Sequence, residues 1–143
     1  MIETLLTRPY WIIDILPAQV PADSAGQYFA VEKYFLSEPR YTDLRQRYAE
    51  LLLKLNCYYD LEVGFPGKEG SRLNPPPEKL HAWLVREHRD LCVLLPGEEA
   101  LLTLDHGDTY MTVYNPGEKL LALLGQLARA SGLFLWQPAV SDK

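Results

Sequence analysis

Residues 10–16, the stretch YWIIDIL, are hydrophobic except for Asp14 and predict a strand. One face of this stretch carries Trp11, Ile13 and Ile15. The other face carries Tyr10, Ile12, Asp14 and Leu16. Because both faces hold apolar side chains, the pattern predicts a strand that is covered on both sides. Shorter apolar or alternating runs predict further strands over 61–65, 90–96 and 133–137.

Residues 42–57 have the clearest helical period in the chain. Their apolar residues fall on one stripe, formed by Leu44, Tyr48, Leu51, Leu52 and Leu55. This spacing predicts an amphipathic helix whose stripe packs on a sheet. The charged residues between them are predicted to face water: Asp43, Arg45, Arg47, Glu50 and Lys54. A second helix of about twelve residues is predicted to begin in the proline run and to carry Leu80, Trp83 and Leu84.

Residues 26–36, GQYFAVEKYFL, predict a short helix of a different kind. Apolar side chains occur nearly all round it, and Pro39 stops the pattern soon afterwards. A helix with no polar face is either deeply buried or part of an interface. The sequence leaves both alternatives open.

Residues 100–114 predict a hairpin around a His106-Gly107 turn. That turn would pair Leu104 with Thr109 and Leu102 with Met111. The aliphatic side chains would then share one face, and Thr103, Tyr110 and Thr112 would share the other. A last helix is predicted to follow this hairpin, before the strand at 133–137.

The order of these segments predicts an α+β fold. It contains strands, helices and a hairpin without regular β-α-β alternation, which favours a mixed, mostly antiparallel sheet of about five strands with three to four helices packed on it. We found no repeat or linker and therefore expect one domain over residues 1–143. Residues 66–79 are the one long irregular stretch, either a binding lid or a mobile loop.

The composition is that of an ordinary globular domain, with 143 residues, 48% hydrophobic, and an acidic balance of −5. Residues 40–89 hold nine Lys or Arg against seven acids, too mild and too mixed an excess for a nucleic-acid interface. No apolar run approaches the roughly 18 residues of a membrane span, and no secretory leader is apparent, so we expect a cytoplasmic protein. Cys57 and Cys92 lie in apolar stretches and are predicted to be buried, reduced thiols.

No motif of the sequence indicates an enzyme. Nucleophile-elbow and phosphate-loop patterns do not occur. His81 and His88 are seven residues apart on one predicted helix, about 10.5 Å along its axis, too far for two zinc–nitrogen bonds of about 2 Å. The residues Asp105, His106 and Asp108 are more typical of a turn than of a cation site. We expect no metal and no cofactor.

Aromatic side chains are the most unusual feature. Nine tyrosines and three tryptophans occur in the chain, and most of them crowd residues 10–59. Tyr and Trp are frequent in binding hot spots, although a tyrosine-rich core is the alternative. The candidate binding residues are Trp11, Asp14, Tyr28, Phe29, Tyr34, Phe35 and Tyr41. Tyr48 ends the aromatic segment 26–48, where we expect an interface.

Asp14 has two interpretations, because a bare carboxylate among apolar residues is costly to bury. As a structural tether it would accept backbone N–H groups from residues 17–27, or pair with Arg8 or Lys33. As a functional acid it would have a raised pKa in a cleft beside Trp11 or Tyr10. The sequence favours the tether.

We therefore expect a non-catalytic protein that binds a protein partner. The alternative is a small-molecule-binding domain or enzyme, with a pocket near Trp11 and Asp14 between the sheet and loops 16–26 and 66–79. A third possibility is a homodimer formed through the same surface. The sequence names neither the ligand nor the partner.

Overall fold

The computed structural model describes residues 1–139, which form five α-helices and one seven-stranded sheet. The strands are β1 (Tyr10–Asp14), β2 (Glu62–Gly64), β3 (Ser71–Leu73), β4 (Leu91–Leu95), β5 (Ala100–Leu104), β6 (Met111–Tyr114) and β7 (Phe134–Trp136). Their order is β3-β2-β4-β5-β6-β1-β7, and every neighbouring pair is antiparallel. The α+β class is confirmed, but the sheet has seven strands rather than about five. The sequence analysis missed β3, which lies inside the stretch that it treated as irregular.

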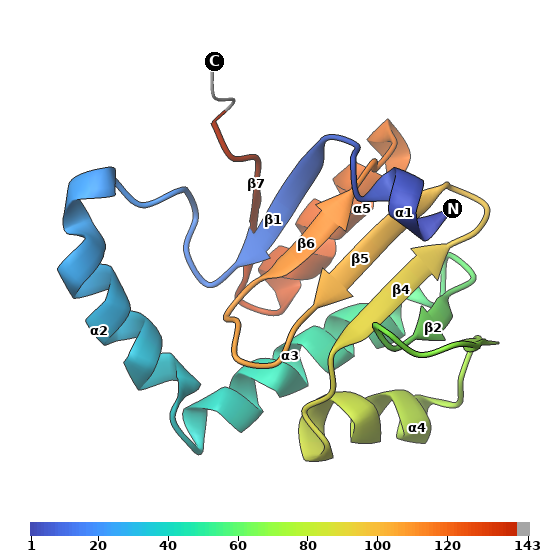
Figure 1. Ribbon diagram of the computed structural model, residues 1–143, viewed down its shortest axis with the longest axis horizontal. Coiled ribbons are helices and arrows are strands. Elements are labelled where there is room, and N and C mark those ends of the chain that lie inside the picture. The colour runs from blue at the N-terminus through green and yellow to red at the C-terminus, as the bar shows by residue number, and fades with distance from the viewer. Residues whose placement is uncertain (140–143) are drawn as a thin grey trace.

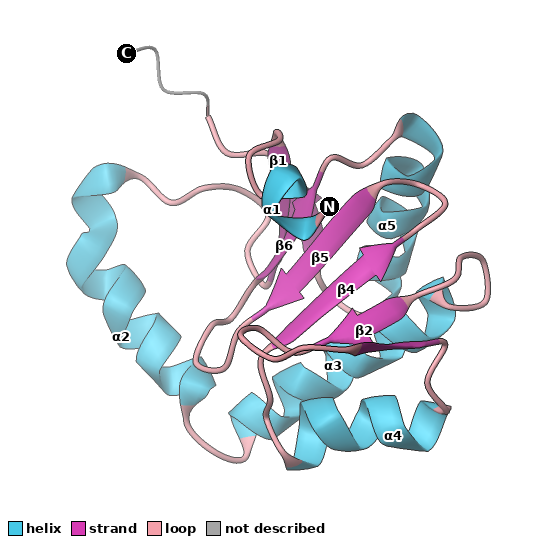
Figure 2. Ribbon diagram, turned by 45° about the vertical axis from the view of Figure 1, so that its right-hand side comes forward, coloured by secondary structure: helices cyan, strands magenta, loops and turns pink. Residues whose placement is uncertain are grey.

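The helices are α1 (Ile2–Leu5), α2 (Ala25–Leu36), α3 (Arg40–Leu55), α4 (Pro77–His81, continued by a π-helical turn over Ala82–Arg86) and α5 (Glu118–Ala130). Helices α3, α4 and α5 lie on one face of the sheet, and the short α1 lies on the other (Figures 1 and 2). Helix α2 stands apart from the sheet and contacts mainly α3. Within residues 1–139, no helix is both long enough and apolar enough to cross a membrane.

The core fills the space between the sheet and α3, α4 and α5. On β1 it receives Ile13, with Trp11 and Ile15 packed against it, as the alternation predicts. On α3 the whole predicted stripe is buried, with exposed fractions of 3% or less. Fully buried aliphatic side chains of this kind each stabilise a fold by about 1.5–3 kcal/mol, so this layer holds the molecule together.

The β5–β6 hairpin has a different register from the predicted one. Leu102 faces Val113 rather than Met111, and the loop between the strands is longer than two residues. Contacts from outside the hairpin hold this loop: the N–H of Gly107 donates to the Tyr41 hydroxyl at 2.8 Å, and the N–H of His106 donates to an Asp90 carboxylate oxygen at 2.6 Å. Because the shift is two residues, each side chain still lies on the predicted face.

Two polar residues lie where the sequence analysis did not expect them. Arg45 was predicted to face water but is fully buried, with its guanidinium donating to the Arg89 carbonyl at 2.7 Å and lying near the Tyr41 ring. The π-helical turn after α4 contacts α3 and covers that side of the helix. Cys57 was predicted to be buried but is exposed just beyond the end of α3, whereas Cys92 is half-buried; both are free thiols.

Candidate binding groove on the open face of the sheet

The face of the sheet opposite α3 and α5 carries a groove of about 590 Å³. Its floor comes from β1, β6 and β7, and its rim from the loop after β1 and from α2. Five aromatic side chains line it: Tyr10, Tyr28, Tyr110, Tyr114 and Trp136. Helix α1 covers the neighbouring strand β5, where Leu101 is fully buried, and so the groove is confined to one side of this face.

Strand register brings the floor residues together from distant parts of the sequence. Tyr10 of β1 pairs with Tyr114 of β6, and their ring centroids are 5.8 Å apart. Ile12 lies between Thr112 of β6 and Trp136 of β7. All these residues occupy alternate positions on the side of their strands away from the core, which explains why they share one surface.

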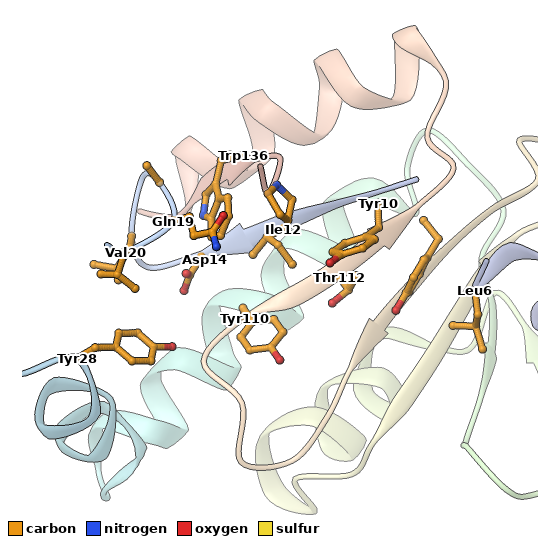
Figure 3. A pocket seen from close by; sticks show the side chains of 14 residues that line it. Leu6, Tyr10, Ile12, Asp14, Gln19, Val20, Tyr28, Tyr110, Thr112 and Trp136 are labelled. Carbon is orange, nitrogen blue, oxygen red and sulfur yellow. The ribbon is translucent and has the colours of Figure 1, made fainter. Parts of the chain in front are cut away.

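Helix α2 forms the outer wall of the groove. Tyr28 reaches from α2 towards the space between Asp14 and Tyr110 (Figure 3). Its hydroxyl donates to the Glu32 carboxylate one turn further along, at 3.4 Å. On the outer side of the helix, Phe29 and Tyr34 are 61% and 55% exposed. Of the two alternatives that the sequence left open for this helix, deep burial is wrong, because these side chains are exposed.

Asp14 lies at the end of β1, where the chain leaves the sheet, and only 6% of it is exposed. One carboxylate oxygen accepts the N–H of Ile15 at 2.7 Å, and the N–H of Leu16 also contributes a hydrogen bond. Desolvation nevertheless dominates and, together with the nearby Glu32 charge, raises the pKa of Asp14 from 3.8 to about 6. The backbone bonds therefore leave the carboxylate only partly compensated.

The tether predicted for Asp14 is wrong in its partners. Its backbone donors are the next two residues, not residues 17–27. Arg8 and Lys33 make no ion pair with it. The ion pairs found within residues 1–139 are His88–Glu38 and Arg89–Glu87. The carboxylate lines a groove and has a raised pKa, as the alternative interpretation expected, but its neighbours there differ: Tyr10 lies at the other end of β1, and Trp11 lies on the core side of the strand.

The charged side chain that lines the groove is negative, and no positive side chain of the lining offsets it. The lining contains Asp14 but no lysine, arginine or histidine. Burial raises the pKa of Tyr28, and the carboxylates of Glu32 and Asp14 raise it further. Burial also raises the pKa of Tyr110, followed by the charges of Asp108 and Asp105. Each of these carboxylates disfavours another negative charge in the groove.

The predicted binding residues divide into two groups. Asp14 and Tyr28 line the groove, and Phe29 and Tyr34 are exposed on the adjoining helix α2. Phe35 is half-buried in the crease between α2 and α3. The others lie away from the groove: Trp11 is half-buried against the core, and Tyr41 and Tyr48 are buried. Tyr48 donates its hydroxyl to the carbonyls of Ile13 and Thr109, at 2.9 and 2.7 Å.

Sequence analysis missed most of the groove floor. Tyr110 and Thr112 were predicted to lie opposite the aliphatic face of the hairpin, and Tyr10 on one of two covered faces of its strand, but Tyr114 and Trp136 were not singled out. The available signal was the alternation within each strand. Nothing in the chain indicated that β1 would lie between β6 and β7, and that pairing is what makes one surface of three separate segments.

The two loops proposed to enclose one pocket lie at different places. The loop after β1 borders the groove through Leu16, Gln19 and Val20. Loop 66–79 instead borders a second hollow of about 330 Å³ at the β2–β4 side of the same face, beside Gly64 and Cys92. The pocket expected between both loops is therefore two separate hollows.

Chemical groups for a metal site do not come together in the part of the chain that the structure describes: no three His, Cys, Asp or Glu side chains form a group that could hold an ion.

Comparison of the chain with protein-family models, with curated proteins and with solved structures found no match.

Proposed function

We propose that this protein binds a protein partner through the groove and the exposed side of α2. The observation that carries this proposal is the exposure of apolar side chains on α2. Over residues 26–36, seven of eleven residues are apolar, yet each of the seven is exposed or only half-buried. A helix of this length is marginal in water without a surface to pack on. A partner that covers Phe29 and fills the groove beside Tyr28 supplies that surface.

The composition of the groove supports the same proposal. Tyrosine and tryptophan contribute large contact areas and polar tips, and they are enriched at the centres of interfaces. The lining holds no His, Ser, Cys or Lys that could serve as a nucleophile or a base beside Asp14. We therefore infer binding rather than catalysis as the role of this surface. The cytoplasmic location stays a prediction of the sequence.

Site-specific photo-crosslinking tests the proposal. Benzoyl-phenylalanine replaces Phe29 on α2 in one variant and Ala122 in a second, because Ala122 is exposed on α5 in the opposite layer. In cells of the organism that makes this protein, we expect the Phe29 variant to form a discrete adduct with another protein. The Ala122 variant should not form that adduct. Adducts from both positions alike, or from neither, would contradict the proposal. An adduct only with a second copy of the chain would replace the partner by a homodimer.

A small-molecule ligand is the second candidate, favoured by the size of the groove. Its volume of about 590 Å³ lies within the usual range of ligand pockets, roughly 300–1,000 Å³. Thermal unfolding in the presence of a metabolite library tests it. A compound that raises the melting temperature of the wild type but not of a Tyr110→Ala variant would support this candidate.

A further inference from the structure

We propose that the groove receives an arginine side chain of the protein partner, whose guanidinium pairs with Asp14 between the rings of Tyr28, Tyr110 and Trp136. This inference deepens the proposed function and rests on it. Three independent features of the groove lead to it: an uncompensated carboxylate, a set of aromatic faces, and a one-sided charge.

The first feature is the carboxylate itself. Asp14 is nine-tenths buried, and its hydrogen bonds come only from the backbone of the next two residues. A carboxylate offers about four acceptor positions, so those bonds leave others open. No lysine or arginine of residues 1–139 forms an ion pair with it. A cation from outside the chain would supply the counter-charge and the hydrogen-bond donors that Asp14 does not find within residues 1–139.

The second feature is the ring system around the carboxylate. Tyr28 comes from α2, Tyr110 from the loop before β6 and Trp136 from β7, and they surround the space next to Asp14 (Figure 3). Guanidinium groups stack on aromatic faces and pair with carboxylates through two parallel hydrogen bonds. Arginine uses both contacts together, whereas the compact ammonium group of lysine is more strongly hydrated. The combination therefore favours arginine.

The third feature is charge complementarity. Glu32 raises the pKa of Asp14, and the charges of Asp108 and Asp105 add to the effect of burial in raising the pKa of Tyr110. The chain as a whole carries −5. An anionic ligand would be repelled by all of these groups, and a neutral one would leave the Asp14 charge desolvated. A basic partner is attracted from a distance and neutralises the buried carboxylate on contact.

A titration with small probes tests this inference. N-acetyl-arginine methylamide is added to the ¹⁵N-labelled protein, and the indole N–H signal of Trp136 is followed by NMR. The probe N-acetyl-citrulline methylamide has nearly the same shape without the charge. Asp14→Asn keeps an oxygen for the backbone N–H donors but removes the charge. Glu118→Gln removes one charge from exposed α5 in the opposite layer and is the matched control.

We expect the arginine probe to bind with a dissociation constant at least about tenfold lower than that of the citrulline probe. Asp14→Asn should abolish this preference, and Glu118→Gln should keep it. Tyr28→Leu should weaken the arginine probe by about threefold, whereas Tyr28→Phe, which retains a ring, should not. Tyr28 lies on α2 outside the core, so this pair remains informative if Asp14→Asn does not fold.

Equal binding of both probes, or binding of neither, would overturn the arginine inference. An unchanged preference in Asp14→Asn would also overturn it. None of these results bears on the crosslink from Phe29, which reports on partner binding alone. A positive crosslink with a negative titration therefore leaves the proposed function standing and removes only the arginine.

Discussion

The two faces of the sheet differ in the kind of side chain that they bury. The face against α3 and α5 consists of aliphatic residues such as Ile13, Leu102 and Val113, all fully buried. The open face near β1 mixes aliphatic residues such as Ile12 with four tyrosines, a tryptophan, a threonine and Asp14. Aliphatic side chains have no polar atoms to satisfy, so they close into a core, whereas side chains with polar tips hold a surface that stays open to a ligand. One face stabilises the molecule, and the other is the surface that we propose for partner binding.

The largest expected effect compares neighbouring residues of β5 that lie on opposite faces. Leu102→Ala should lower the free energy of unfolding by about 2–5 kcal/mol, because it leaves a cavity in the core. Thr103→Ala, one residue further on, should lower it by less than about 1 kcal/mol. Urea denaturation of both variants measures the difference. Similar losses would show that the open face contributes to stability as much as the core does.

The next effect compares two tyrosine hydroxyls. Tyr48 is fully buried, and its hydroxyl is the donor for two backbone carbonyls that join β1 to the loop before β6. Tyr48→Phe leaves those acceptors without that donor and should destabilise the fold by about 1–3 kcal/mol. Tyr110→Phe, at a half-buried position in the open groove, should change stability by less than about 0.5 kcal/mol. Thermal unfolding of the two variants checks the contrast.

The third effect is the pH dependence that Asp14 gives to stability. Its folded pKa of about 6 lies above the ordinary value of 3.8, so the folded protein binds more protons between these values. Stability should therefore fall as pH rises through this window and stay level above it. The groups that act on Asp14 or are acted on by it are Glu32 and Tyr28 from α2, and Tyr48 from α3.

Asp14→Asn removes this contribution. We expect the variant to be more stable than the wild type by about 1 kcal/mol near pH 7, less than the full shift implies because groove water screens the charge. The difference should shrink as the pH falls and vanish below about pH 3, where the carboxyl group is protonated in both the folded and the unfolded state. A variant that is less stable than the wild type at neutral pH would instead identify Asp14 as a structural tether. Urea titrations across the pH range decide between the two.

The smallest expected effect concerns the outer side of α2. Phe29→Ala should leave the free energy of unfolding within about 0.5 kcal/mol of the wild type, since the ring is exposed. Tyr34→Ala should cost slightly more, up to about 1 kcal/mol, because the Arg40 guanidinium lies 3.9 Å from the centre of its ring. A loss of 2 kcal/mol or so from Phe29→Ala would mean that α2 is packed, and the contrast between α2 and α3 would disappear.

Local periodicity was sufficient to predict the core face of the molecule. The stripe of α3 is apolar on one side only, so its inward side chains could be identified without the fold. Strand β1 is apolar on both faces and was predicted to be covered on both, but one of its faces lines the open groove. The predicted register of the β5–β6 hairpin was wrong by two residues, but the alternation within each strand still placed its aliphatic side chains on one face. Arg45 was the exception, because a long charged side chain on a helix is assigned to water unless a neighbouring element covers it.

The groove could not be predicted in the same way. Its floor needs β1 to lie between β6 and β7, a pairing of segments more than 90 residues apart. Aromatic residues close in sequence were the available guide, and they led to Trp11 and Tyr41, which point into the core. Asp14 was identified because its chemistry is unusual at that position, but whether it faced the core or the groove depended on contacts that alternation alone does not give.

Direct titration of the Asp14 carboxyl carbon by NMR tests the central claim that this carboxylate is left without a counter-charge by the fold. We predict an Asp14 pKa of about 6 in the free protein, falling when the arginine probe is present in excess. A value below the ordinary 3.8 in the free protein would mean that the charge is already satisfied within the chain. Asp14 would then be part of the scaffold rather than the centre of a binding groove.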